Sequence, residues 1–208
     1  MKIIDLSQKF TNDMTKFPGS LQPEIKQIAN YATDGYRVTD FHCDVHGGTH
    51  CDAPAHFVEG LKMIEDLDLK HFVGGAVIVD YDMELGREIP VSVLDGENIN
   101  AGDILLFRTG MSVHWNTQEY IDNYPYLSTE LAKKIVDLGV VAIGMDSLSP
   151  DAVDSGDVHN IILGAGIISI ENLNNLDKIT QKRFFFSAAP LLIDNAEGGL
   201  TRAYGIID

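Results

Sequence analysis

The segment from residue 46 to residue 56 constrains this chain more than any other, because it combines metal-ligand side chains with residues that interrupt helices. It reads His-Gly-Gly-Thr-His-Cys-Asp-Ala-Pro-Ala-His, and it holds His46, His50, Asp52 and His56. Imidazole and carboxylate are ligands that divalent zinc and manganese accept. Two glycines and a proline make a regular helix unfavourable. The segment therefore predicts a turn-rich metal site.

The spacing within this segment indicates extended chain and turns. His46 and His50 stand four residues apart, as in the helical zinc motif of metalloproteases, but here Gly47 replaces the glutamate of that motif. His50 and Asp52 are two apart, the period of a strand, so both side chains can point the same way. Three ligands leave one position of a tetrahedral metal open, as hydrolytic sites need. His56 is then available as an acid or base, because imidazole titrates near neutral pH.

The residues just before this segment predict a strand that leads into it. Apolar and polar side chains alternate over residues 36–46, and we expect the apolar face to pack against the core. His46 would then lie at the end of the strand. Asp44, on the same face, is expected either to orient a ligand imidazole or to be solvated. His42 either lines the cavity or is an ordinary polar residue.

The remaining pattern predicts a strand-rich α/β fold with few helices, in a chain whose 208 residues fit one domain. The elements do not alternate as in a doubly wound sheet. Further strands are expected over residues 2–6, 24–29, 75–81, 104–108, 140–145, 167–170, 183–188 and 203–207. Helices are expected over residues 117–123, 128–138 and 158–163, the second of them capped by Ser128.

Charge and composition exclude several classes of protein. The formal net charge of −16 makes nucleic acid an unfavourable partner. No apolar run reaches the roughly 20 residues that span a bilayer, and the first residues lack the layout of a signal peptide. We expect a cytoplasmic protein. Its two cysteines, Cys43 and Cys51, are too few for a disulfide framework and are expected to be buried thiols.

Other chemistry-bearing residues lack a supporting pattern. No Gly-x-Ser-x-Gly elbow surrounds the serines of residues 147–155, and no dinucleotide fingerprint follows a strand. Residues 146–157 form an acid-rich segment, which is expected to be a surface connection or a lid. Trp115 and Tyr124 are expected either to line an aromatic pocket or to belong to the core. Phe17 is a further candidate for the pocket wall.

The pattern His46-x-Gly48-Thr49-His50-x-Asp52-x-Pro54-x-His56 resembles the signature of the cyclase family of metal-dependent hydrolases, with every fixed position filled. The resemblance implies that family's swivelling β/β/α fold. Further matching segments lie at residues 5–7, 17–19, 102–110, 114–115, 124–125, 144–147, 158–164 and 170–173.

The resemblance also implies two divalent metal ions, zinc first and manganese as the alternative. His46, His50 and Asp52 would bind one ion. Asp52 would bridge to the second, which His159 and Glu171 also hold. On their own, His159 would be an ordinary helix residue and Glu171 an ordinary carboxylate at the end of a strand. The family likeness makes both of them candidate ligands.

By the same resemblance, His56 is the catalytic acid or base of a hydrolase that cleaves a small amide C–N bond. The expected reaction is of the arylformamidase type, from N-formylkynurenine to kynurenine and formate. The alternatives are a cyclic amide such as isatin, another lactam or ester, or a metal-binding domain without catalysis. The resemblance further implies a small-molecule substrate and a homodimer or higher homo-oligomer, in which N-terminal residues cross into the neighbour's site.

Overall fold

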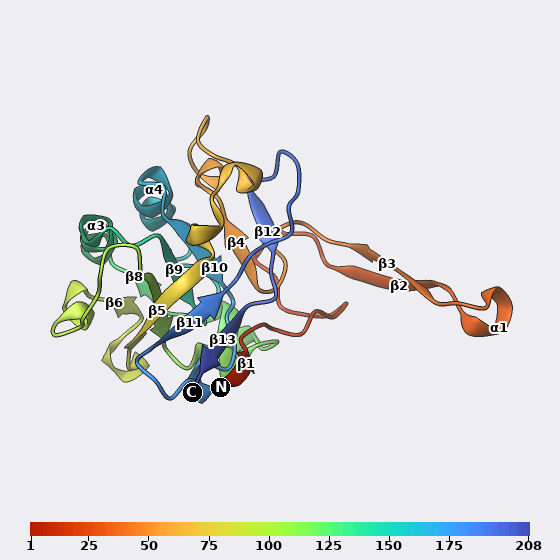
Figure 1. Cartoon of the computed structure of the whole chain (residues 1–208), viewed down its shortest axis with the longest axis horizontal. Helices are drawn as coiled ribbons and strands as arrows, with labels where there is room; N and C mark the ends of the chain where they lie inside the picture. The colour runs from red at the N-terminus through yellow and green to blue at the C-terminus, as the bar shows by residue number, and fades with distance from the viewer.

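A mixed β-sheet of nine strands organises the molecule, in a computed structural model that describes residues 1–208 (Figure 1). The four strands β5, β7, β9 and β10 are parallel to one another, and the strands on either side run antiparallel to their neighbours. The order across the sheet is β1 (Lys2–Asp5), β13 (Tyr204–Ile207), β11 (Arg183–Ser187), β5 (Val73–Asp80), β7 (Ile104–Arg108), β9 (Ala142–Met145), β10 (Ile168–Glu171), β4 (His50–Asp52) and β12 (Gly198–Leu200).

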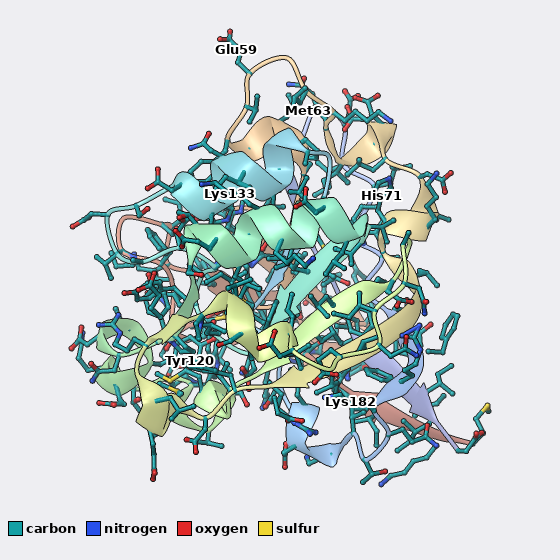
Figure 2. The ribbon with its side chains drawn as sticks, turned by 90° about the vertical axis from the view of Figure 1, so that its left-hand side faces the viewer. Glu59, Met63, His71, Tyr120, Lys133 and Lys182 are labelled. Atoms are coloured by element: carbon teal, nitrogen blue, oxygen red, sulfur yellow. The ribbon has the colours of Figure 1, made fainter.

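Two helices cover one face of this sheet, as Figure 2 shows. They are α3 (Thr129–Leu138) and α4 (Asp157–Gly164). Leu105 and Phe107 of β7 point to this face and share a core cluster with Ile135 of α3. Because successive side chains of a strand point to opposite faces, the remaining side chains of β7 enter a second core on the other side of the sheet.

The second core shows that the sheet curls. It contains Ile104 and Leu106 of β7 together with Ile4 of β1 and Cys51 of β4. Ile4 and Cys51 belong to strands near opposite edges of the sheet, yet they lie in the same cluster. The curved sheet therefore encloses its own apolar face, and β4 is buried at every residue.

One part of the chain leaves this body altogether. Strands β2 (Glu24–Ala29) and β3 (Val38–His42), joined through the short helix α1 (Tyr31–Asp34), form a hairpin that projects far from the sheet (Figure 1). We call residues 24–42 the arm. Every residue of β3 is exposed. At the base of the arm, the Asn12 side chain bonds both the backbone N–H and the carbonyl of Ile25.

The arm corrects one prediction. Residues 36–46 do not form a strand that packs on the core: β3 ends at His42, and Phe41 is 45% exposed. His42 lies on the exposed arm and lines no part of the cavity described below. An alternating pattern shows that a strand has two unlike faces, but it does not show what covers the apolar one.

Smaller elements complete the fold. Strands β6 (Glu88–Ile89) and β8 (Tyr126–Leu127) form a separate parallel pair, and α2 spans Gln118–Asp122. None of the helices has the length and apolarity that crossing a membrane requires. The 3-10 helices are η1 (Pro54–His56), η2 (Ile64–Asp66), η3 (Leu69–His71), η4 (Met83–Leu85), η5 (Val91–Leu94), η6 (Met111–His114) and η7 (Leu176–Lys178).

The expected strand-rich α/β class is confirmed, and the elements predicted for the body lie within two residues of their expected positions. Strand β7 has the predicted bounds, and the Ser128 side chain accepts a hydrogen bond from the Leu131 N–H at the start of α3. The prediction missed the short strands β4, β6, β8 and β12. Of these, β4 and β12 frame the candidate site.

Candidate metal centre

Strand β4 supplies two site residues from one side of its backbone. The side chains of His50 and Asp52 lie together, with 3.3 Å between His50 Nε2 and Asp52 Oδ1. Cys51 points the opposite way, into the core, where its Sγ donates to the Ala188 carbonyl at 3.1 Å. The predicted common direction of His50 and Asp52 is thus observed, and Cys51 is the buried thiol that was expected, with no part in the site.

Strand β10 brings a distant carboxylate to the same place. In the antiparallel pairing of β10 with β4, Glu171 lies directly opposite His50, and Glu171 Oε2 is 3.6 Å from His50 Nε2. His159, in the first turn of α4, reaches the same carboxylate, with 3.1 Å between its Nε2 and Glu171 Oε1. Residues from two elements that follow β4 by more than a hundred positions therefore complete the cluster.

His46 enters from the turn between the arm and β4. Its Nδ1 donates to Asp52 Oδ1 at 2.8 Å, and its Nε2 lies 3.3 Å from Glu197 Oε1. Of the two roles considered for Asp44, the structure does not show the one that orients an imidazole, because that carboxylate accepts from the backbone N–H groups of His46 and Leu21 instead. Asp44 shapes the turn that presents His46, but it does not contact the ring.

Asp52 stands at the centre of the cluster, between histidines from three parts of the chain. Its Oδ1 faces His46 and His50, and its Oδ2 lies 3.6 Å from His159 Nε2. Asp52 is 1% exposed, yet Oδ2 has no hydrogen-bond partner. A buried carboxylate oxygen without a partner is costly unless something positive binds it. The donor set around this oxygen, imidazole nitrogens and carboxylate oxygens, fits a divalent zinc or manganese ion.

The electrostatics of the cluster favour positive charge at this point. Burial works against protonation of His50, but Asp52 and Glu171 outweigh it and raise the pKa of His50 to about 9. Burial likewise opposes charge on His159, whose pKa is nevertheless raised by hydrogen bonds to Asp151, Asp52 and Glu171. Burial also opposes charge on Asp52, but the nearby imidazoles lower its pKa well below the usual value. A bound cation would take the place of these protons.

His56 differs from the other imidazoles. It ends the 3-10 helix η1, and its ring centroid lies 4.1 Å from that of His46. Burial lowers the pKa of His56 to about 4, and the neighbouring imidazoles add to this effect against the opposing attraction of Asp52. His56 is therefore neutral at pH 7 and has a nitrogen lone pair available for a proton.

Backbone and carboxylate partners fix the orientation of two imidazoles. His159 Nδ1 donates to Asp151 Oδ2 at 2.6 Å, and His50 Nδ1 donates to the Gly48 carbonyl at 2.9 Å. Each bond leaves the Nε2 atom directed toward the cluster, which is the usual arrangement around a ligand histidine. Asp151 also accepts from the backbone N–H groups of Val158 and His159, so it holds the start of α4 as well.

Asp151 and Glu197 were not foreseen. The acid-rich segment that holds Asp151 was expected to be a surface connection or a lid, but residues 146–151 are buried beside the site. No local pattern marked Asp151, because it lies six residues before α4 begins and reaches the first N–H groups of that helix only through the fold of the intervening loop. Glu197 gave no signal, because it reaches His46 through the pairing of β12 with β4.

The cluster forms the floor of a cavity of about 260 Å³. Phe17 lines this cavity, as expected, and so does Phe57, whose ring stacks on His159 at 4.4 Å. Trp115 and Tyr124 take the alternative role and pack in a separate core cluster. The lining residues are Thr15, Lys16, Phe17, Ser20, His46, Gly48, His50, Asp52, His56, Phe57, Leu148, Ser149, Ala152, Ser155, His159, Glu171 and Asn172.

The structure thus brings all six predicted site residues to one cavity floor, although it groups their ligand atoms differently from the expectation. In two sets of three residues, ligand atoms lie within 4.8 Å of one another, and both sets contain Asp52. How the residues divide between two ions stays a prediction. One set is His46, Asp52 and His56, and the other is His50, Asp52 and Glu171.

Comparison with known proteins places this geometry in a family. Residues 4–152 match the model of the cyclase family, described as "Putative cyclase". Over 203 residues the chain is 32% identical to kynurenine formamidase of Bacillus cytotoxicus, covering 96% of this chain and 95% of that protein. It is 30% identical to kynurenine formamidase of Bacillus anthracis over 205 residues, or 97% of this chain and 96% of the relative.

Solved structures show the same architecture. Isatin hydrolase A from Labrenzia aggregata superposes with a TM-score of 0.90 at 21% identity, covering 99% of this chain and 93% of that one. A predicted metal-dependent hydrolase from Bacillus stearothermophilus superposes with a TM-score of 0.83 at 26% identity, covering 98% of this chain and 97% of that one. The first likeness establishes the fold, and the family match extends over most of the chain. This protein therefore belongs to the cyclase family of metal-dependent hydrolases.

Proposed function

We propose that this protein hydrolyses a small aryl formamide, N-formylkynurenine, to kynurenine and formate in a metal-dependent reaction. The observation that carries the proposal is Asp52, a buried carboxylate with a partnerless oxygen among three histidines on a cavity floor. The substrate is suggested by the full-length likeness to proteins named kynurenine formamidase. The cavity also has room and apolar walls for a small aromatic molecule.

The residues present fit two divalent cations, zinc first and manganese as the alternative. His46, His50 and Asp52 would hold one of them, and Asp52, His159 and Glu171 the other. Such a pair, when bound, supplies Lewis acidity, which activates water and polarises an amide carbonyl at neutral pH. The fixed orientation of His50 and His159 places both Nε2 atoms ready to ligate without rearrangement.

His56 is the residue proposed to move the proton. It is neutral at pH 7 and lines the cavity beside His46, so it can accept a proton from the attacking water. The hydroxyl of that water joins the formyl carbon, the C–N bond breaks, and His56 returns the proton to the leaving nitrogen. The products are formate and the free aryl amine. Phe17 and Phe57 supply apolar walls for the ring of that amine.

The direct test is hydrolysis of N-formylkynurenine by protein that has been stripped with a chelator and then reloaded with zinc or manganese. We expect no turnover by the stripped protein and recovery on reloading, with elemental analysis giving the number of ions per chain. Reloaded protein that binds two ions per chain but hydrolyses no formamide would contradict the proposal. Isatin, the cyclic alternative, is assayed in parallel. Turnover of isatin alone would change the proposed substrate but would keep the proposed metal site.

We also propose that the chain forms a homodimer or a higher homo-oligomer through the arm. The arm exposes large apolar side chains, with Ile28 60%, Tyr31 75% and Tyr36 58% accessible. A two-stranded hairpin is at best marginally stable in water by itself, and apolar side chains of this kind favour contact with another copy. Light scattering of the purified protein measures the mass of the assembly. A cytoplasmic location and N-terminal residues that cross between sites stay predictions.

A further inference from the structure

Lys16 is the one ammonium group that lines the cavity. The other basic groups there are imidazoles, and the acids Asp52 and Glu171 belong to the metal cluster. Lys16 is half-buried, and its Nζ donates to the carbonyl oxygen of Ser20. It forms no ion pair with an acidic side chain of this chain.

The neighbouring backbone holds Lys16 in place. Thr15, directly before it, is 8% exposed and exchanges two hydrogen bonds with Asn116: its N–H donates to Asn116 Oδ1 at 2.8 Å, and its Oγ1 accepts from the Asn116 N–H at 2.9 Å. Met14 is also buried. Lys16 is therefore part of a fixed wall of the cavity and is not a freely moving surface residue. Phe17, next in the chain, lines the same wall.

The chemistry of the ammonium group points to an anion. An ammonium carries three N–H donors and no acceptor, and the Ser20 carbonyl takes only one of those donors. A half-buried charge with free donors gains most from a negatively charged ligand. The carboxylates of the cavity floor do not reach it, so the anion has to come from the molecule that fills the cavity.

We propose that Lys16 binds the carboxylate of the substrate, and that it thereby distinguishes aryl formamides with a carboxylate-bearing side chain from those without one. The inference rests on the proposed function for the identity of the scissile bond. Lys16 is then a specificity residue. It selects among formamides by whether they have a carboxylate at a distance from the formamide group. It leaves the bond-breaking step to the cavity floor.

The test compares two substrates that differ in one group. N-formylkynurenine carries the carboxylate, and N-formylkynuramine has a hydrogen in its place while keeping the ring, the formamide and the amine. With metal-loaded Lys16→Met, we expect KM for N-formylkynurenine to rise about tenfold or more, the loss expected for one charge-assisted hydrogen bond. Kinetics on N-formylkynuramine should not change. Lys16→Arg should restore part of the affinity, because it restores the charge.

Lys133→Ala is the matched control, since it removes the same charge from the exposed surface of α3 (Figure 2). We expect it to behave as the native protein with both substrates. The inference is overturned if Lys16→Met leaves KM for N-formylkynurenine unchanged. It is also overturned if that variant loses turnover equally on both substrates, because Lys16 would then act at the reacting carbonyl.

Calorimetry separates this inference from the proposed function. Kynurenine and kynuramine, the two amine products, are titrated into metal-loaded protein without any turnover. Preferential binding of kynurenine that disappears in Lys16→Met supports the carboxylate site even if no formamide is hydrolysed. Equal binding of both products by the native protein overturns it, whatever the outcome of the hydrolysis assay.

Discussion

Strands β3 and β4 lie close in the sequence and carry the same kinds of residue, yet they have opposite surroundings. β3 (Val-Thr-Asp-Phe-His) is exposed at every residue and pairs only with β2. β4 (His-Cys-Asp) is buried at every residue and pairs with β10 on one side and β12 on the other. Histidine and aspartate become a site in β4 because two neighbouring strands fix the backbone and bring further ligands. In β3 the same residue types remain solvated.

The comparison separates what one chain can order by itself from what needs a partner. The site residues all come from the body of the chain: from β4, β10, α4 and the 3-10 helix η1, and from the turn that holds His46. The arm has no such support, because its strands contact mainly each other. We therefore expect substitutions in the two regions to differ sharply in effect.

The largest expected effect comes from Asp52→Asn, which keeps the shape of the side chain but removes its charge. We expect loss of bound metal and a fall in kcat/KM of more than about 10⁴-fold. Without the metal no water is activated for His56 to deprotonate, so the contribution of general acid–base catalysis, about 10²–10⁴-fold, is lost together with that of the metal. The matched control is Asp40→Asn on exposed β3, which should retain full metal content and activity. Normal metal content in Asp52→Asn would contradict the central place given to this carboxylate.

His56→Ala should lower kcat by about 10²–10⁴-fold while the metal content stays unchanged. The reason is that a proton-transfer group is lost and the proposed ligands remain. Elemental analysis and kinetics on the same sample measure both effects, with His42→Ala on the arm as the control. Loss of metal in His56→Ala would instead make His56 a ligand, as its proximity to His46 and Asp52 allows.

The same contrast should appear in stability. Ile170 is fully buried in β10. Its replacement by Ala should lower the free energy of unfolding by about 2–5 kcal/mol, because a cavity remains in the core. Ile28, 60% exposed on β2, should cost no more than about 0.5 kcal/mol. Urea unfolding of both variants measures the difference. A large loss for Ile28→Ala at low protein concentration would show that the arm packs on something within the chain.

Removing the arm should change assembly and leave the body folded. Glu24 and His42 are paired across the base of the hairpin, so a two-residue Gly-Gly link can replace residues 25–41. We expect a smaller assembly by light scattering and a circular dichroism spectrum that retains the sheet. An unchanged number of subunits would overturn the assignment of the arm as the contact between copies.

The smallest expected effect concerns a surface ion pair at the edge of the body. The hydrogen bond from Arg202 is the main reason that the pKa of Asp5 lies below its usual value of 3.8. A lowered folded-state pKa stabilises the fold above pH 3.8, and this stabilisation is lost as the pH falls through the folded pKa. Asp5→Asn should therefore be slightly less stable than the native protein near pH 7, by less than Ile170→Ala. The two unfolding curves should converge in acid.

The sequence revealed those parts of the site that are contiguous in the chain. Residues 46–56 could be recognised because ligand residues stand at short, fixed spacings. His159 and Glu171 were predicted only through the family signature, since nothing local marks them. Asp151, Glu197 and Lys16 were missed, because each reaches the site through tertiary pairing that no local pattern encodes.

The fold was predictable to a similar extent. Strands such as β7 have a run of apolar residues long enough to stand out, and α3 has both a cap and an apolar stripe. β4 has only three residues, and two of them are site residues, so it carries no strand signal of its own. Its strand character comes from β10 and β12, which reach it from more than a hundred residues away. Sheet order, for the same reason, was not predictable.

Asp151 has a consequence for how the protein responds to metal. One carboxylate holds both the His159 imidazole and the first backbone N–H groups of α4, so ligand geometry and helix initiation share a partner. Under the proposed function, metal binding at His159 and ordering of that first turn are therefore thermodynamically linked, and each must favour the other. Amide hydrogen exchange at Val158 and His159 should slow when metal is added, although both amides donate to Asp151, which is not one of the proposed ligands. Amide exchange in the first turn of α4 thus measures whether the site is occupied.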